Sequence, residues 1–163
     1  MKKILTIAPH PDDETLGCGG TLLRHHFEGD ECHWLIMTKL DKSIGYDEYQ
    51  IKQRDKEISI VSKMYSFKTV SQLDLITTMM DTYALSEIIK KVSKIINKIK
   101  PDTIYLPYYN DVHSDHRITY DAVISSTKSF RASYIKKIVA YETLSETEFA
   151  LGNSKDTFDP NLF

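Results

Sequence analysis

Short apolar runs alternate along the chain with longer segments in which apolar residues recur at the spacing of one helix face. The clearest helical segment is Tyr83–Lys98, and Pro101 follows it, where prolines commonly stand after a helix end. Its apolar face comprises Leu85, Ile88, Ile89, Val92, Ile95, Ile96 and Ile99. Continuous apolar runs such as Lys3–Ala8 are typical of strands that are buried on both faces.

The full pattern predicts five strands and four main helices. We expect strands at Lys3–Ala8, Cys32–Thr38, Phe67–Val70, Thr103–Leu106 and Ile135–Tyr141, and helices at Glu14–Glu28, Tyr49–Tyr65, Tyr83–Lys98 and Arg117–Phe130. The packed faces of the first two helices are expected to contain Leu16, Leu22, Leu23 and Phe27, and Ile51, Ile58, Val61 and Met64. Regular alternation of strands and helices predicts an α/β fold, a Rossmann-like three-layer sandwich with a mostly parallel central sheet.

Composition narrows the class of protein. The 163 residues suit a single domain covering positions 1–163, and 41% of them are hydrophobic. With 21 basic and 23 acidic residues, bulk charge gives no reason to expect a nucleic-acid partner. No run approaches the ~18 apolar residues of a membrane span, and the first apolar run is too short for a signal peptide. We therefore expect a cytoplasmic protein, with Cys18 and Cys32 as reduced, buried thiols.

Three polar segments follow strands of the expected sheet: His10–Glu14, Met37–Asp41 and Pro107–His116. Ligands bind parallel sheets at the carboxyl ends of the strands, so these segments should lie at one edge. The first holds His10 beside acidic residues, and the last holds the run HSDH. A catalytic zinc site uses three protein ligands and leaves one position for water, which one histidine and one aspartate from the first loop and one histidine from the last would satisfy.

The same residues also have ordinary explanations. Asp12 or Asp13 could simply cap the helix that begins near Glu14, and His113 and His116 could be loop histidines. The metal site is favoured because three histidines and three aspartates converge on the expected ligand edge. The other histidines, His25, His26 and His33, lie away from this edge.

APHPDDETLGCGGTL at Ala8–Leu22 resembles the signature of the LmbE-like, or PIG-L, family of zinc-dependent de-N-acetylases. DVHSDHR at Asp111–Arg117 resembles the family's H-x-D-H, and QRDKE at Gln53–Glu57 resembles its R-x-x-E. The resemblance implies that His10, Asp13 and His116 bind the metal, Zn²⁺, with Fe²⁺ also suited to these ligands. It further implies that Asp12 is the general base, that His113 donates to the oxyanion and that Asp115 orients His113.

The reaction implied is hydrolysis of an acetamide on an amino sugar or glycoconjugate, which gives a free amine and acetate. Arg54, Asp41 and Tyr46 are candidates for binding the rest of the substrate. The chain ends at Phe163, where family members usually continue, so the resemblance leaves open either a naturally short C-terminus or a truncated sequence. A metal-dependent hydrolase of another bond and a non-catalytic sugar-binding subunit stay open as alternatives, and the sequence leaves open whether the protein is a homo-oligomer.

Overall fold

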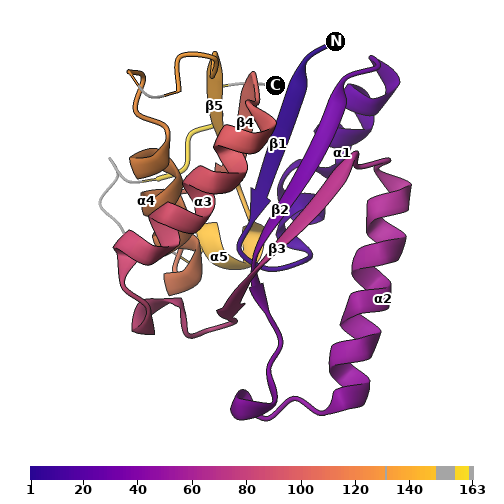
Figure 1. The fold of residues 1–163 in the computed structure, drawn as a ribbon, viewed down its shortest axis with the longest axis vertical. Coiled ribbons are helices and arrows are strands. Elements are labelled where there is room, and N and C mark those ends of the chain that lie inside the picture. Colours follow the sequence, from indigo (N-terminus) through magenta and orange to yellow (C-terminus); the bar gives the residue numbers. More distant parts are fainter. Residues whose placement is uncertain (131, 150–156, 162–163) are drawn as a thin grey trace.

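The protein is described by a computed structural model, which covers residues 1–130, 132–149 and 157–161. The strands are β1 (Lys3–Ala8), β2 (Glu31–Lys39), β3 (Thr69–Ile76), β4 (Thr103–Pro107) and β5 (Lys137–Tyr141). The helices are α1 (Asp13–Phe27), α2 (Glu48–Met64), α3 (Leu85–Ile99), α4 (Ser114–Ser126) and α5 (Leu144–Thr147), with short 3₁₀ turns η1 (Lys42–Ile44) and η2 (Met80–Thr82). The described strands form one sheet in the order β3-β2-β1-β4-β5, and every pairing is parallel. The expected α/β sandwich is confirmed (Figure 1).

Helices cover both faces of the sheet and create two cores. Side chains alternate along a strand, so Ile4 and Ala8 of β1 face one layer while Leu5 and Ile7 face the other. The first layer packs against α1 and, more loosely, α2, and the second packs against α3 and α4. The stripe expected on α3 is confirmed at its centre, where Ile88, Val92 and Ile96 are fully buried.

The expected packed face of α1 is largely wrong. Leu22 is buried as expected, but Leu16, Leu23 and Phe27 are exposed. The buried face instead carries Glu14, Cys18, Gly19 and Leu22, because α1 lies close to the sheet and leaves room mainly for small residues. The helix also departs from helical geometry at Cys18, where φ is −144°, which shifts the phase that a continuous helix would have.

Two other expectations need correction. On α2, Ile51, Ile58 and Val61 are only half-buried and Met64 is exposed, because this helix covers the periphery of the sheet. Strand β3 is Thr69–Ile76 and not Phe67–Val70, since its edge position allows polar residues in the sheet that resemble loop sequence. Both cysteines are free and buried, as expected.

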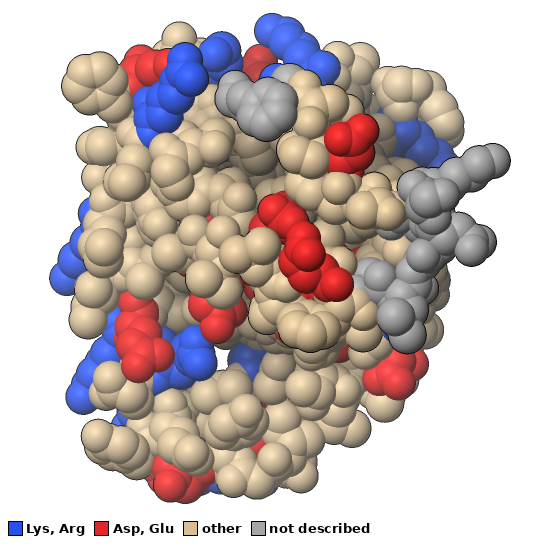
Figure 2. Space-filling view, turned by 180° about the vertical axis from the view of Figure 1, so that it is seen from behind, with Lys and Arg blue, Asp and Glu red and all other residues tan. Residues whose placement is uncertain are grey.

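The strand order reverses direction between β1 and β4, because β2 and β3 extend to one side and β4 and β5 to the other. Such a switch point opens a crevice at the carboxyl ends of the two strands. On the face shown in Figure 2, one group of acidic side chains lies near the middle, and other acidic side chains lie among the lysines and arginines toward the edges. None of the helices in the described part of the chain is long and apolar enough to cross a bilayer.

Candidate metal centre

The first half of the centre is the turn that joins β1 to α1. The backbone N–H of His10 donates to Oδ2 of Asp13 at 2.8 Å, and the N–H of Asp12 donates to the carbonyl of His10 at 3.0 Å. This turn brings the imidazole Nδ1 of His10 within 3.4 Å of the same Asp13 oxygen. His10 and Asp13 are therefore held side by side at the carboxyl end of a buried strand.

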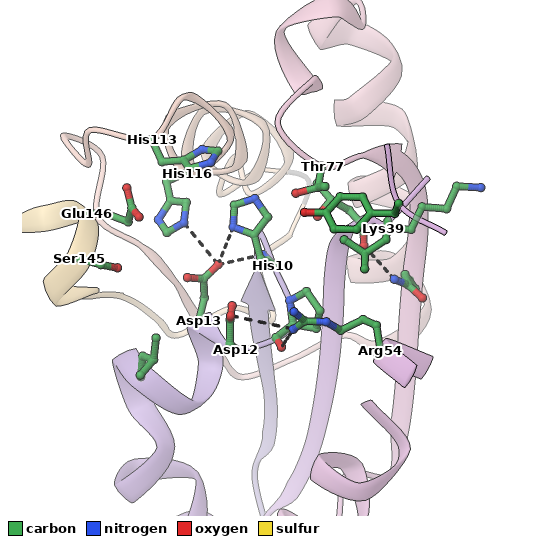
Figure 3. A pocket seen from close by; sticks show the side chains of 16 residues that line it. His10, Asp12, Asp13, Lys39, Arg54, Thr77, His113, His116, Ser145 and Glu146 are labelled. Atoms are coloured by element: carbon green, nitrogen blue, oxygen red, sulfur yellow. Dashed lines mark hydrogen bonds and ion pairs between the residues drawn. The ribbon is translucent and has the colours of Figure 1, made fainter. Parts of the chain in front are cut away.

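The second half comes from the start of α4, which follows β4. His116 lies in the first turn of this helix, is buried, and places Nε2 3.3 Å from Oδ2 of Asp13. Figure 3 shows both imidazoles pointing at this oxygen. The ligand atoms of His10, Asp13 and His116 all lie within 4.8 Å of one another. The structure thus brings the two predicted loops together in one cluster.

Each histidine of this cluster uses its other ring nitrogen to contact a second carboxylate. Nε2 of His10 lies 3.1 Å from Oδ2 of Asp115, and Nδ1 of His116 lies 2.8 Å from Oδ2 of Asp111. Metal-binding histidines almost always have such a partner, which fixes the tautomer and the ring orientation. Two imidazole nitrogens and one carboxylate oxygen are a donor set that suits Zn²⁺ or Fe²⁺, so the residues fit a divalent metal.

The carboxylates give the centre a negative potential. Burial alone would lower the pKa of His10 and His116, but hydrogen bonds to Asp115, Asp111 and Asp13 raise each to about 9. Burial would likewise raise the pKa of Asp13, yet its hydrogen bonds to the two histidines hold it well below the usual range. A position that favours positive charge so strongly also favours a divalent cation.

Asp115 has a different partner from the one expected. Its carboxylate accepts from the backbone N–H groups of Thr78 at 2.7 Å and Met80 at 3.2 Å, and its side-chain hydrogen bond to a histidine goes to His10 and not to His113. It is fully buried, so its position behind His10 is fixed. Thr78 has a φ of 63°, a region that costs a β-branched residue about 1–3 kcal/mol, and this strained backbone supplies one of the amides.

His113 is oriented by the backbone. It precedes α4 as the N-cap residue, and its Nδ1 accepts the N–H of Asp115 at 3.1 Å. A nitrogen that accepts a hydrogen bond carries no proton, so the proton of neutral His113 is on Nε2. Burial and the neighbouring His10 lower the pKa of His113, which favours this neutral form. The ring lies against His10, with centroids 4.7 Å apart.

Asp12 stands at the opening of the centre. It occupies the N-cap position of α1, but its side chain makes no capping hydrogen bond, so the capping explanation does not hold for it. Its side chain is 56% exposed, and a guanidinium nitrogen of Arg54 lies 4.0 Å from Oδ2. Partial burial and Asp13 raise the pKa of Asp12 above its usual value, while Arg54 opposes this shift. Arg54 also donates to the Pro11 carbonyl at 3.1 Å, which fixes it over this loop.

These residues surround a cavity of about 250 Å³. Of the residues predicted from sequence, those that line it are His10, Asp12, Asp13, Tyr46, Arg54, His113 and His116. Asp41 does not line it; its carboxylate instead accepts from the Ser43 N–H at 2.9 Å and begins η1. The cavity also contains residues that the sequence did not single out: Gln72, Thr77, Ser145 and Glu146 among others. Ser145 and Glu146 form the wall opposite Arg54 (Figure 3).

The remaining acid of the first motif, Glu14, lies outside the cavity. It is fully buried beneath the cavity, where burial raises its pKa to about 7. Apart from the groups that include His10, the described residues contain another group of possible metal donors, His25, Glu28 and Asp30, which lies at the amino ends of the strands, near the start of β2. There Arg24 contacts Glu28 and the N–H of Lys2 donates to Asp30, so these acids already have partners.

The α/β sheet therefore carries at its switch point a His-Asp-His cluster whose donor set suits a divalent metal, with the carboxylate of Asp12 beside it. Residues 5–127 match the family model described as PIG-L: GlcNAc-PI de-N-acetylase. The chain belongs to this family.

Several known proteins are similar to this chain. It is 29% identical over 128 residues to diacetylchitobiose deacetylase of Thermococcus kodakarensis, and the matched region covers 72% of this chain and 46% of that protein. It is 30% identical over 147 residues to YaiS, an uncharacterized deacetylase of Escherichia coli K12, covering 87% and 74%. The solved structure of N,N'-diacetylchitobiose deacetylase from Pyrococcus horikoshii superposes with a TM-score of 0.69 at 28% identity, covering 83% and 52%. The chain thus spans about half the length of these diacetylchitobiose deacetylases.

Proposed function

We propose that this protein is a metal-dependent de-N-acetylase that hydrolyses the N-acetyl group of an N-acetylglucosamine-type sugar or glycoconjugate. The observation that carries the proposal is the convergence of His10, Asp13 and His116 on one point. The carboxylate of Asp12, which makes no capping hydrogen bond to α1, lies beside this point in the same cavity. Family membership and the deacetylases among its relatives support the choice of an amide bond over another bond.

In this proposal His10, Asp13 and His116 hold the metal, Zn²⁺ or Fe²⁺. When bound, the metal would polarise the acetamide carbonyl and lower the pKa of a water toward ~7. Asp12 takes the proton of the attacking water as the new carbon–oxygen bond forms. The carbon–nitrogen bond then breaks, Asp12 returns the proton to the leaving nitrogen, and the products are a free amine and acetate.

His113 and the cavity wall complete the site. The Nε2–H of His113 is directed by the cap hydrogen bond at Nδ1, and in this position it would donate to the carbonyl oxygen as negative charge develops there. Arg54 holds the Asp12 loop and, with Tyr46, is proposed to contact the sugar. Asp115 is proposed to act through His10, and Asp41 through the shape of the η1 turn. A cytoplasmic location is proposed as well, supported by the two free thiols.

The test combines metal content with amine release. The purified chain is expected to bind about one divalent metal, and His116→Ala should lose it. N-acetylglucosamine and N,N'-diacetylchitobiose are then assayed for amine and acetate. Phosphate release from phosphorylated sugars without amine release would overturn the de-N-acetylase proposal, as would sugar binding without turnover at saturating zinc.

Asp12→Ala separates chemistry from metal binding. We expect its metal content to stay near that of the wild type, while turnover falls by a factor on the order of 10²–10⁴, the contribution of a positioned general base. Asp13→Ala is the matched control, because it removes the neighbouring carboxylate and should abolish metal binding. Turnover of Asp12→Ala close to wild type would rule out its role as the base.

A further inference from the structure

The short helix α5 contacts the loop that precedes α4 and contains Asp111 and Val112. The Oγ1 of Thr147 donates to Oδ1 of Asp111 at 2.7 Å, and the N–H of Val112 donates to the carbonyl of Glu146 at 3.0 Å. Thr147 and Asp111 are both buried. A helix that also lines the cavity, and that lies 36 positions away from Asp111 in sequence, therefore contacts the loop before α4.

The hydrogen bonds of Thr147 define the direction of its hydroxyl. Its Oγ1 accepts the N–H of Thr143 at 2.9 Å, so the hydroxyl proton is available for Asp111. An ionised carboxylate only accepts, which gives the same direction. The other oxygen of Asp111 contacts Nδ1 of His116 at 2.8 Å. A continuous chain of hydrogen bonds therefore runs from Thr143 through Thr147 and Asp111 to His116.

We propose that Thr147 is a positioning residue for the metal centre: it fixes the Asp111 carboxylate, which in turn orients the His116 imidazole with Nε2 toward Asp13. This inference rests on the proposed metal centre. Without the hydroxyl, Asp111 would keep its bond to His116 but lose the contact that fixes its own rotation. The imidazole would then sample orientations that direct Nε2 away from Asp13.

The other histidine provides an internal contrast. Asp115 behind His10 is held by the backbone N–H groups of Thr78 and Met80, which no side-chain substitution removes. The His116 arm instead depends on one hydroxyl from a separate helix. Loss of Thr147 should therefore weaken one ligand and leave the His10–Asp13 pair in place.

The experiment measures Zn²⁺ affinity of the full chain by competition with a chelator, together with the absorption spectrum of the Co²⁺-loaded protein. Thr147→Val keeps the shape and removes the hydroxyl, and we expect it to weaken Zn²⁺ binding about tenfold, at the lower end of the effect of losing an outer partner of a metal ligand. The Co²⁺ spectrum should change as well, because a displaced imidazole alters the ligand field. Thr147→Ser should restore both readouts.

Thr143→Val is the matched control. Thr143 belongs to the same turn and is equally buried, but its hydroxyl has no hydrogen-bond partner within the described residues. We expect its Zn²⁺ affinity to stay within about twofold of the wild type. If Thr147→Val does not fold, Thr147→Ala is measured by the same two readouts.

The outcomes distinguish this inference from the proposed metal centre. Wild-type affinity and spectrum in the Thr147 variant, with a wild type that binds metal, would overturn the role of Thr147 alone. A wild type that binds no Zn²⁺ would overturn the metal centre and this inference with it. An equal loss of affinity in Thr143→Val would show a general effect of the turn and would also overturn the specific role.

Discussion

Gly17 and Gly20 of α1 differ in the space around them: Gly17 is tightly packed and Gly20 is open. A Cβ at Gly17 would lie 2.2 Å from the ring of Tyr141, a buried side chain whose hydroxyl donates to the Ile7 carbonyl at 2.9 Å. A Cβ at Gly20 would meet no atom within 4 Å. The close approach at Gly17 fixes the start of α1, and with it the turn that carries Asp12 and Asp13.

Gly17→Ala should therefore destabilise the protein. Tyr141 is anchored at its hydroxyl and cannot rotate away, so we expect a loss of about 1–3 kcal/mol in the free energy of unfolding, typical of overpacking. Gly20→Ala is the control and should stabilise the protein by roughly 0.5–1 kcal/mol, because alanine is the better helix residue. Denaturant unfolding of both variants checks this, and equal effects of the two substitutions would contradict the close contact.

At the scale of single elements, α1 shows why sequence patterns locate a helix better than its buried face. Its existence follows from the spacing of apolar residues, yet three of the four leucine and phenylalanine side chains expected inside are exposed. Where a helix packs closely on the sheet, its buried face contains small residues, and a pattern of hydrophobic residues does not identify a glycine as buried. The buried Glu14 is equally invisible to such a pattern, since a carboxyl group is normally read as solvent-facing.

The neighbouring residues Leu22 and Leu23 allow the same substitution to test which face of α1 is buried. Leu22 is fully buried and Leu23 is 51% exposed. We expect Leu22→Ala to cost about 2–5 kcal/mol in the free energy of unfolding and Leu23→Ala less than ~0.5 kcal/mol. Thermal or urea unfolding measures both, and a cost at Leu23 as large as that at Leu22 would contradict the exposed position of Leu23.

The candidate site divides in the same way. Residues in the two short motifs could be predicted, because β1 and β4 place both loops at one edge whatever the details of packing. Asp111 lies just before the second motif and could have been found by its charge, whereas Thr147 has no local signature. Its contact with Asp111 exists only because α5 returns to this loop in three dimensions.

At the scale of the whole molecule, one aspartate connects the starts of neighbouring strands. Oδ2 of Asp102, just before β4, accepts the N–H of Lys3 at 2.9 Å, and Oδ1 lies 3.2 Å from Nζ of Lys136 before β5. These bonds to Lys3 and Lys136 lower the pKa of Asp102. One carboxylate therefore connects the amino ends of β1, β4 and β5.

This carboxylate makes stability depend on pH. A carboxyl group whose pKa is lower in the folded state stabilises the fold above its unfolded pKa of ~3.9, and the contribution is lost as pH falls through the folded value. Asp102→Asn should lower the melting temperature at pH 7 by about 2–4 °C, the effect of roughly 1 kcal/mol in a domain of this size. The difference from wild type should shrink as pH falls below ~4. Melting curves at pH 7 and pH 3 check this. Asp74→Asn is the control, because the Asp74 side chain is 82% exposed. A difference in melting temperature between Asp102→Asn and wild type that stays the same at both pH values would exclude this pH dependence.

The contacts around the candidate metal centre span most of the chain. His10 meets Asp115 across 105 positions, and the Tyr141 hydroxyl reaches the Ile7 carbonyl across 134. Contacts of such long range form late, because each must first close a large loop. During synthesis, the His10–Asp13 turn therefore leaves the ribosome long before α4 and α5 can join it. His10, Asp13 and His116 can come together only after α4 has been made and has packed on the sheet, so a metal would bind the assembled fold and would not template it.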